Sequence, residues 1–89
     1  MCRNIKTLFN FEPPATDEEI RASSIQFVRK ISGATKPSKA NQAAFDRAVD
    51  QVSDAATYLL ASLVTSAPAR DREIDAAKAR KRAAKRFAV

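Results

Sequence analysis

The sequence is poor in the residues on which most enzymes and metal sites depend. Its 89 residues include no histidine, no tryptophan and a single cysteine, Cys2. Without an imidazole or a second thiol, one chain can form neither an ordinary zinc site nor a Cys–His or Ser–His catalytic pair. A lone cysteine also excludes an internal disulfide. We therefore expect a chain with a reduced thiol, no metal and no cofactor.

Glycine and long apolar runs are also scarce. One glycine and four prolines exclude a fold built from many tight hairpins. No run approaches ~18 apolar residues, and no signal-peptide-like segment follows Arg3 and Lys6. The sequence thus predicts no membrane contact and a cytoplasmic location.

The apolar side chains that are present fill little volume. Hydrophobic residues make up 45% of the chain, but 18 of them are alanine. A chain this short buries a modest share of its surface even with a full complement of large side chains. The core of a lone monomer would be thin, so we expect a homo-oligomer, with a dimer as the simplest form.

The net charge of +6 is confined to the C-terminal end. Residues 1–77 carry ten basic and ten acidic side chains, whereas residues 78–89, the basic tail, carry basic ones alone. The basic side chains of the tail are Lys78, Arg80, Lys81, Arg82, Lys85 and Arg86. On a helix, four of these six fall within ~100° of one another, which suits contact with successive phosphates. The tail predicts non-specific binding of nucleic acid or another polyanion, and a solvated terminus is the alternative.

A first helix is indicated by its two ends. Thr16 and Glu19 have the spacing of a capping box. Gly33, the single glycine, stands where a helix C-cap belongs. The apolar face is expected to contain Ile20, Phe27 and Ile31.

A second helix has the strongest periodic signal in the sequence. It follows the Lys36-Pro37-Ser38 turn, with Ser38 or Thr35 as its start, and runs for about 25 residues to Thr65–Ser66. Its expected core face is Phe45, Val49, Val52, Ala56, Leu59, Leu60 and Leu63. Pro68 then breaks the pattern, and Thr65 or Ser66 is expected to cap a third helix.

These elements predict an all-α fold in three parts. Residues 1–15 form an N-terminal arm, residues 16–66 a helical hairpin core and residues 67–89 a basic C-terminal helix, which together make a small helical bundle. The arm carries Ile5, Leu8, Phe9 and Phe11. Their spacing fits either a short helical turn or an extended segment, and both conformations bury these side chains against the helices.

The opening block MCRNIKTLFNFEPPAT resembles the start of a family of small uncharacterised bacterial proteins. The likeness continues through KANQAAFDRAV, SLVTSAPARDRE and the basic end. The resemblance implies a stand-alone small protein, a domain of unknown function, and it implies no catalytic residues.

Three features could carry chemistry, each with a plainer structural explanation. Removal of Met1 would give Cys2 a free amine beside its thiol, a pair able to chelate a metal or attack a carbonyl; the alternative is an incidental thiol. The cluster from Thr35 to Asn41 could bind an anion, or simply cap a helix. The row Asp46, Asp50 and Asp54 could attract a cation, or form a solvated face that receives basic side chains.

The sequence therefore favours a binding module over an enzyme. The leading interpretation is a small helical protein that contacts nucleic acid or a ribonucleoprotein surface through its basic tail. The alternative is a helical protein–protein adaptor or homo-oligomer with a solubilising tail. An enzyme or metal carrier that uses Cys2 is left open as a third class.

Overall fold

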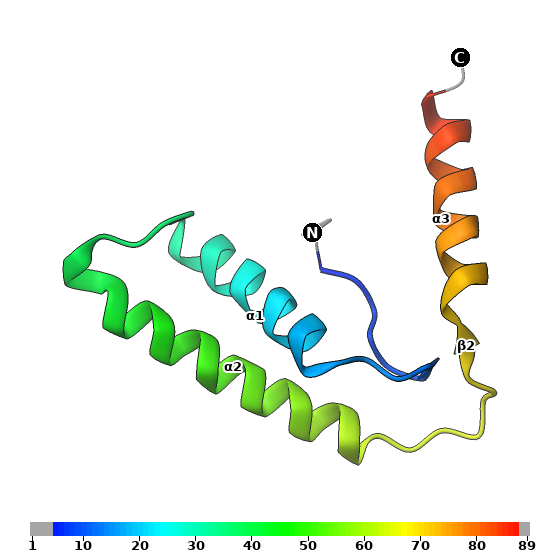
Figure 1. Cartoon of the computed structure of the whole chain (residues 1–89), viewed down its shortest axis with the longest axis horizontal. Coiled ribbons are helices and arrows are strands. Elements are labelled where there is room, and N and C mark those ends of the chain that lie inside the picture. The colour runs from blue at the N-terminus through cyan, green and yellow to red at the C-terminus, as the bar shows by residue number, and fades with distance from the viewer. Residues whose placement is uncertain (1–4, 88–89) are drawn as a thin grey trace.

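The computed structural model describes residues 5–87, with side chains from 5 to 85, and this part of the chain is mostly helical (Figure 1). Its helices are α1 (Asp17–Ser32), α2 (Gln42–Ser62) and α3 (Arg72–Phe87), with a short 3-10 helix η1 (Lys39–Asn41) before α2. Two strands of two residues each, β1 (Phe11–Glu12) and β2 (Arg70–Asp71), pair in parallel. The predicted predominance of helix is confirmed.

Both predicted ends of α1 are confirmed. The Thr16 hydroxyl accepts a hydrogen bond from the Glu19 amide at 3.2 Å, and the Glu19 carboxylate accepts one from the Thr16 amide at 3.0 Å. Gly33 adopts the left-handed conformation, φ 70°, and its amide donates to the Arg29 carbonyl at 2.9 Å. A residue with a Cβ would be strained at this φ, which accounts for glycine here.

The predicted end of the second helix and the predicted start of the third are wrong. Of the two predicted starts of the second helix, Ser38 is the N-cap of η1, which leads directly into α2 at Gln42, although its side chain makes no capping hydrogen bond. Helix α2 ends at Ser62 because Leu63 is already extended. Neither Thr65 nor Ser66 caps α3, which begins at Arg72. Its first turn is instead capped by Asp71, whose carboxylate accepts from the Ile74 amide at 3.0 Å.

A long-range contact explains why the segment between α2 and α3 is extended. The Asn10 side chain donates to the Pro68 carbonyl at 3.1 Å, and the Arg70 amide donates to the Asn10 carbonyl at 2.8 Å. These bonds hold residues 68–71 against the N-terminal segment, where β1 and β2 pair. Of the two conformations left open for the N-terminal arm, residues 5–15 do not have the helical one: Phe9 and Asn10 form a turn, and Phe11 and Glu12 form β1.

The core lies between α1 and α2 and is small. Its buried apolar side chains are Ile20, Val28 and Val49. Ser24 is also buried, and its hydroxyl donates to the Ile20 carbonyl at 2.8 Å, so this buried polar group is satisfied. Few large side chains are therefore buried where α1 packs against α2.

Several predicted core residues are not in the core. In α1, the face toward α2 is centred on Ser24, and this leaves Phe27 44% and Ile31 68% exposed. In α2, Leu59 is 54% and Leu63 44% exposed, because the described segments do not cover the last turn on that side. The predicted apolar faces belong to the right helices, but the prediction that these four side chains are buried in the core is wrong.

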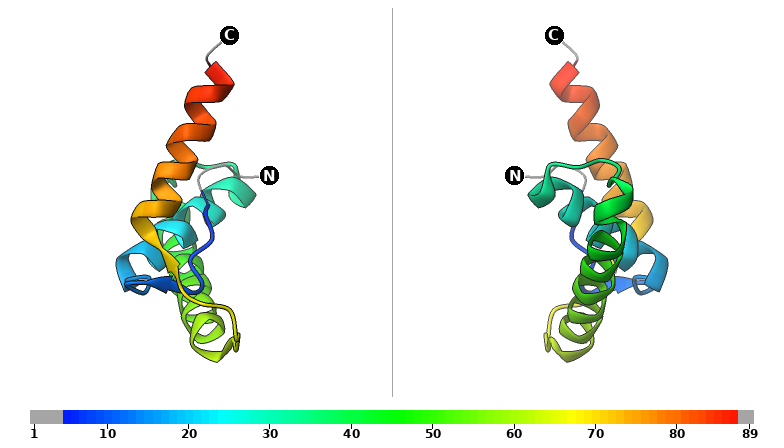
Figure 2. Two further views of the ribbon diagram at one scale, coloured as in Figure 1. Left: turned by 90° about the vertical axis from the view of Figure 1, so that its right-hand side faces the viewer. Right: turned by 90° about the vertical axis from the view of Figure 1, so that its left-hand side faces the viewer.

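The three helices do not form the predicted compact bundle. Helix α3 projects away from the α1–α2 pair, as Figures 1 and 2 show from three directions. The radius of gyration is 15.8 Å, against about 12 Å for a compact chain of this length. Within residues 5–87, no helix combines the length and the apolarity that crossing a lipid bilayer requires.

Candidate anion-binding surfaces

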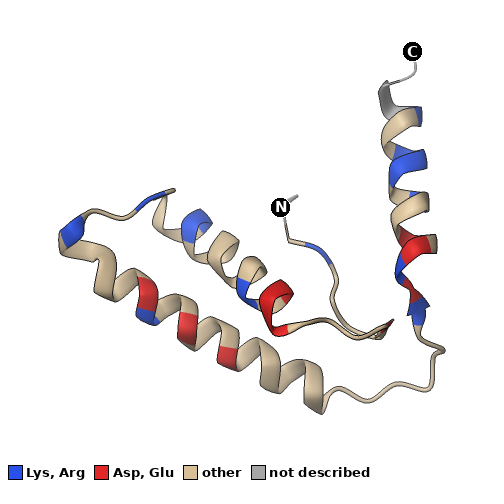
Figure 3. Cartoon of the chain, viewed as in Figure 1, with Lys and Arg blue, Asp and Glu red and all other residues tan. Residues whose placement is uncertain are grey.

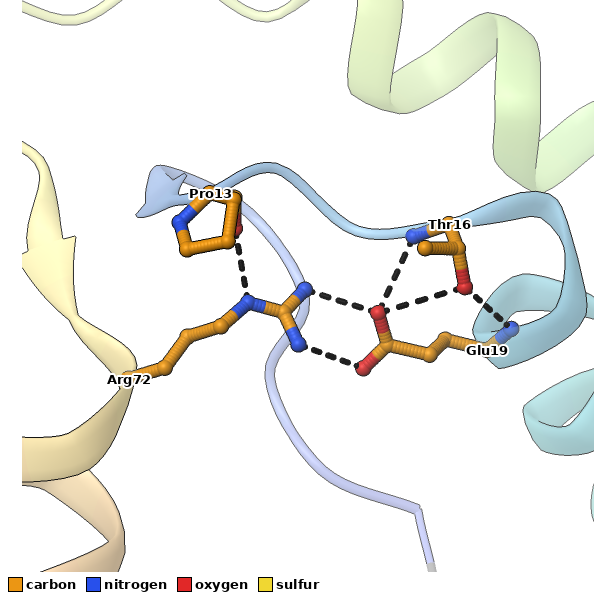
Figure 4. A network of polar contacts seen from close by, with 4 residues as sticks. All are labelled: Pro13, Thr16, Glu19 and Arg72. Carbon is orange, nitrogen blue, oxygen red and sulfur yellow. Dashed lines mark hydrogen bonds and ion pairs between the residues drawn. The ribbon is translucent and has the colours of Figure 1, made fainter.

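Arg72 joins three segments that are distant in the sequence (Figure 4). Its guanidinium donates to both oxygens of the Glu19 carboxylate, with Nη1–Oε2 2.9 Å and Nη2–Oε1 2.7 Å. Its Nε donates to the Pro13 carbonyl at 2.6 Å. The start of α3 is thereby fixed to the N-terminal segment and to the first turn of α1 by a two-pronged ion pair.

This network lowers the pKa of Glu19 from its ordinary value of 4.5 to about 2. The largest cause is the hydrogen bonding from Arg72, followed by the bond from the Thr16 amide; desolvation opposes both. The same contact raises the pKa of Arg72. Both groups are therefore fully charged at neutral pH, and each neutralises the other.

A groove of about 620 Å³ lies beside this network, between residues 5–11 and α3. Its apolar lining comprises Ile5, Leu8, Phe11, Ala76 and Ala79. Its charged lining comprises Lys6, Arg70, Arg72, Arg80 and Arg82 against Glu19 and Asp75. Because five cations face two carboxylates, the groove carries a net positive charge.

The structure divides the predicted anion-binding residues between two surfaces of α3. Arg80 and Arg82 line the groove. Lys78, Lys81 and Lys85, which we call the outer face, are exposed and do not line it. Arg86 lies in α3, but its side chain is outside the part described. The six residues therefore do not act as one patch, because Arg80 points to the opposite side of the helix from the lysines.

Figure 3 shows how charged positions are distributed along the chain: acidic positions recur along α2, and the basic positions of α3 are remote from them. Of the aspartate row, Asp50 pairs with Arg21 at 2.8 Å and Asp46 accepts from Gln42 at 2.9 Å. Among the described residues, no group of three acidic or thiol side chains lies together as a metal site would require. Cys2 lies outside the described residues.

Sequence reasoning did not identify Lys6, Arg70 or Arg72 as residues of an anion-binding surface. In the sequence, the positive charges of Arg70 and Arg72 are offset by the acidic residues Asp71 and Glu73 beside them. The pairing of β1 with β2 brings Arg70 over the Phe11 ring, 5.7 Å from its centroid. No periodicity or local charge excess could have indicated that contact.

The fold and these surfaces define a small, mostly helical protein with an exposed, positively charged C-terminal helix. The chain belongs to a family described as an uncharacterized conserved protein (DUF2277), which matches residues 1–78. The match includes Lys6, Arg70, Arg72 and Lys78, and ends before the rest of the basic tail. No curated protein and no solved structure matches this chain.

Proposed function

We propose that this protein is a non-enzymatic module that binds the phosphates of nucleic acid through α3. The observation that carries the proposal is the exposure of the outer face on a helix that projects from the body. The whole net charge of the chain is concentrated in the basic tail, so α3 is the part of the surface that attracts polyanions most strongly. Such a helix can approach a nucleic-acid strand without rearrangement of the α1–α2 pair.

The expected binding is weak, dependent on salt and nearly independent of sequence. Phosphate contacts give affinity and orientation but carry no sequence information. Four or five phosphates neutralised by the tail would give a log–log salt slope of magnitude ~3.6–4.5 on duplex DNA. Because most of the tail lies beyond the family match, the proposal concerns this chain and not the family as a whole.

Fluorescence anisotropy with labelled duplex DNA tests the proposal. The variant Lys78→Gln/Lys81→Gln/Lys85→Gln removes the outer face. It should lower the slope by ~2.7 units, about 0.9 for each phosphate that is no longer neutralised. The matched control is Lys30→Gln/Lys36→Gln/Lys39→Gln, which removes the same charge from three positions near the α1–α2 connection. Equal weakening in the two variants would show that net charge alone attracts DNA, and the proposal would be wrong.

Truncation after Ala77 is a second test. It removes the tail but leaves Arg72 and its contacts with Pro13 and Glu19 in place. We expect binding to disappear while the helical circular dichroism of α1 and α2 is retained. A truncated protein that binds DNA as well as the full chain, or one that no longer folds, would contradict the proposed role of the tail.

A second candidate function, assembly with another copy as a helical scaffold, is favoured by a separate observation. The accessible surface is 7426 Å², about 2,300 Å² more than the roughly 5,100 Å² of a compact monomer of this mass. A standard interface buries a total of about 1,200–2,000 Å². The excess is thus large enough for a stable dimer, and the proposed dimer does not conflict with the DNA-binding role of α3.

A further inference from the structure

The groove between residues 5–11 and α3 presents two kinds of surface together. Apolar side chains, among them the aromatic ring of Phe11, line it together with Lys6, Arg70 and Arg80, which supply positive charge. Its volume of about 620 Å³ falls within the range of roughly 300–1,000 Å³ that is usual for sites of small organic ligands. The space is larger than a bare inorganic anion needs.

The carboxylates that line the groove do not neutralise all of its positive charges. Glu19 is paired with Arg72, so these two groups contribute no net charge. The other four groove cations form no ion pair with any described side chain, and Asp75 is the one remaining carboxylate among the described lining residues. Three of these cations are arginines, whose planar guanidinium groups match the geometry of phosphate oxygens.

We propose that this groove binds the phosphate of a nucleotide. The phosphate lies between Lys6 and Arg80, which come from opposite walls, and the base or sugar lies against Leu8 and Phe11. The Arg70 guanidinium lies over the Phe11 ring, 5.7 Å from its centroid, so this ring already contacts a positively charged group of the groove. The inference rests on the proposed function and deepens it: the same protein holds a strand by the outer face and one nucleotide in the groove.

A nucleotide fits this lining better than inorganic phosphate does, because the apolar side chains have no role in binding a bare ion. Burial of the base against Leu8 and Phe11 adds a favourable hydrophobic contribution to the charge–charge attraction. We therefore expect adenosine monophosphate to bind at least about tenfold more tightly than inorganic phosphate at equal ionic strength. Equal affinities would overturn the assignment of a nucleotide.

Heteronuclear NMR titration of the full chain with adenosine monophosphate tests the site directly. The expected result is saturable shifts of the Lys6, Phe11 and Ala79 amides, while the Lys36 and Lys39 amides at the far end of the molecule stay unchanged. An absence of saturable shifts at millimolar nucleotide, or shifts that follow the outer face instead, would overturn the proposal.

Two charge-matched variants separate the groove from the outer face. Lys6→Gln/Arg80→Gln removes one cation from each wall of the groove and leaves the Arg72 network intact. Lys78→Gln/Lys81→Gln removes two cations from the same region of the chain, outside the groove. The first variant should weaken nucleotide binding at least about tenfold, and the second should change it less than about twofold. Equal weakening by both would count against a built site.

Short oligonucleotides with and without a 5′-phosphate distinguish a free nucleotide from the end of a strand. Preference for the 5′-phosphorylated strand that disappears in Lys6→Gln/Arg80→Gln would place the terminal nucleotide in the groove; no preference would make the free nucleotide the ligand. DNA binding without nucleotide binding would overturn the groove proposal and leave the proposed function standing. Nucleotide binding in the groove with no salt-dependent DNA binding would overturn the proposed DNA-binding function and leave the nucleotide site in the groove standing.

Discussion

Arg72 connects the start of α3 with two other segments of the chain. It contacts the N-terminal segment at Pro13 and α1 at Glu19, while it is itself the first residue of α3. The side chain of Arg72 is 32% exposed and that of Glu19 is 24% exposed, so solvent partly screens the attraction between their charges. An exposed ion pair of simple geometry contributes little to stability, but a bidentate pair with extra backbone bonds restricts the position of α3.

The Glu19–Arg72 contact makes the stability of the protein depend on pH in the acid range. The pKa of Glu19 is about 2 in the folded chain against an ordinary 4.5, so unfolding takes up a proton between these values. The stabilisation is therefore fully present above pH ~4.5 and decreases as the pH falls toward 2. In Glu19→Gln, the melting temperature should be lower than that of the native protein at pH 7, and the difference should vanish near pH 2.

Thermal melts at several pH values check this dependence, and Glu18→Gln is the control. Glu18 is an exposed neighbour that makes no hydrogen bond or ion pair with the described side chains. Its substitution removes the same charge from the same helical turn, so general dipole effects cancel in the comparison. A pH-independent destabilisation in Glu19→Gln would mean that the Glu19 side chain stabilises the fold by packing and not by its charge.

Among the elements, α2 contributes the most deeply buried side chain of the core. Val49 is 2% exposed and packs at the α1–α2 contact, whereas Leu59 is 54% exposed. In isolated monomers, Val49→Ala should therefore destabilise the fold by about 2 kcal/mol, because it leaves a cavity. Denaturant unfolding measures both changes, and Leu59→Ala should cost less than ~1 kcal/mol at concentrations where the chain is monomeric. The reverse ranking would mean that α2 is rotated relative to the structure.

The helices differ in how far the sequence predicts them, and the reason is physical. Both ends of α1 follow from local chemistry, a capping box and a glycine, so they are predictable from neighbouring residues. The start of α3 has a local cap in Asp71, but the extended segment before it is held by a long-range contact, the bond from the Arg70 amide to the Asn10 carbonyl, which no local signal reports. For the same reason the basic tail was predictable as a charged helix, but its division between a groove and an outer face was not.

At the scale of the whole molecule, the main feature is apolar surface that the monomer does not cover. Large side chains from several segments remain exposed: Ile5, Phe27, Ile31, Tyr58, Leu59, Leu63, Val64 and Ile74. Contiguous apolar patches of more than a few hundred Å² are rare on soluble monomers. Addition of a second α1–α2 pair would give each copy the layer of helices that its own chain lacks.

We expect the protein to be a dimer at high micromolar concentration, with the exposed end of α2 in the interface. Light scattering should give twice the chain mass, and the unfolding midpoint should fall on dilution because association stabilises the folded state by mass action. Leu59→Arg/Leu63→Arg should give a monomer, because burial of two unpaired charges opposes association. Gln51→Arg, an exposed position on the side of α2 opposite Val49, is the control and should leave the dimer intact. A native protein that scatters as a monomer, with a midpoint unchanged by dilution, would show that Val49 and its few buried neighbours suffice to hold a single chain together.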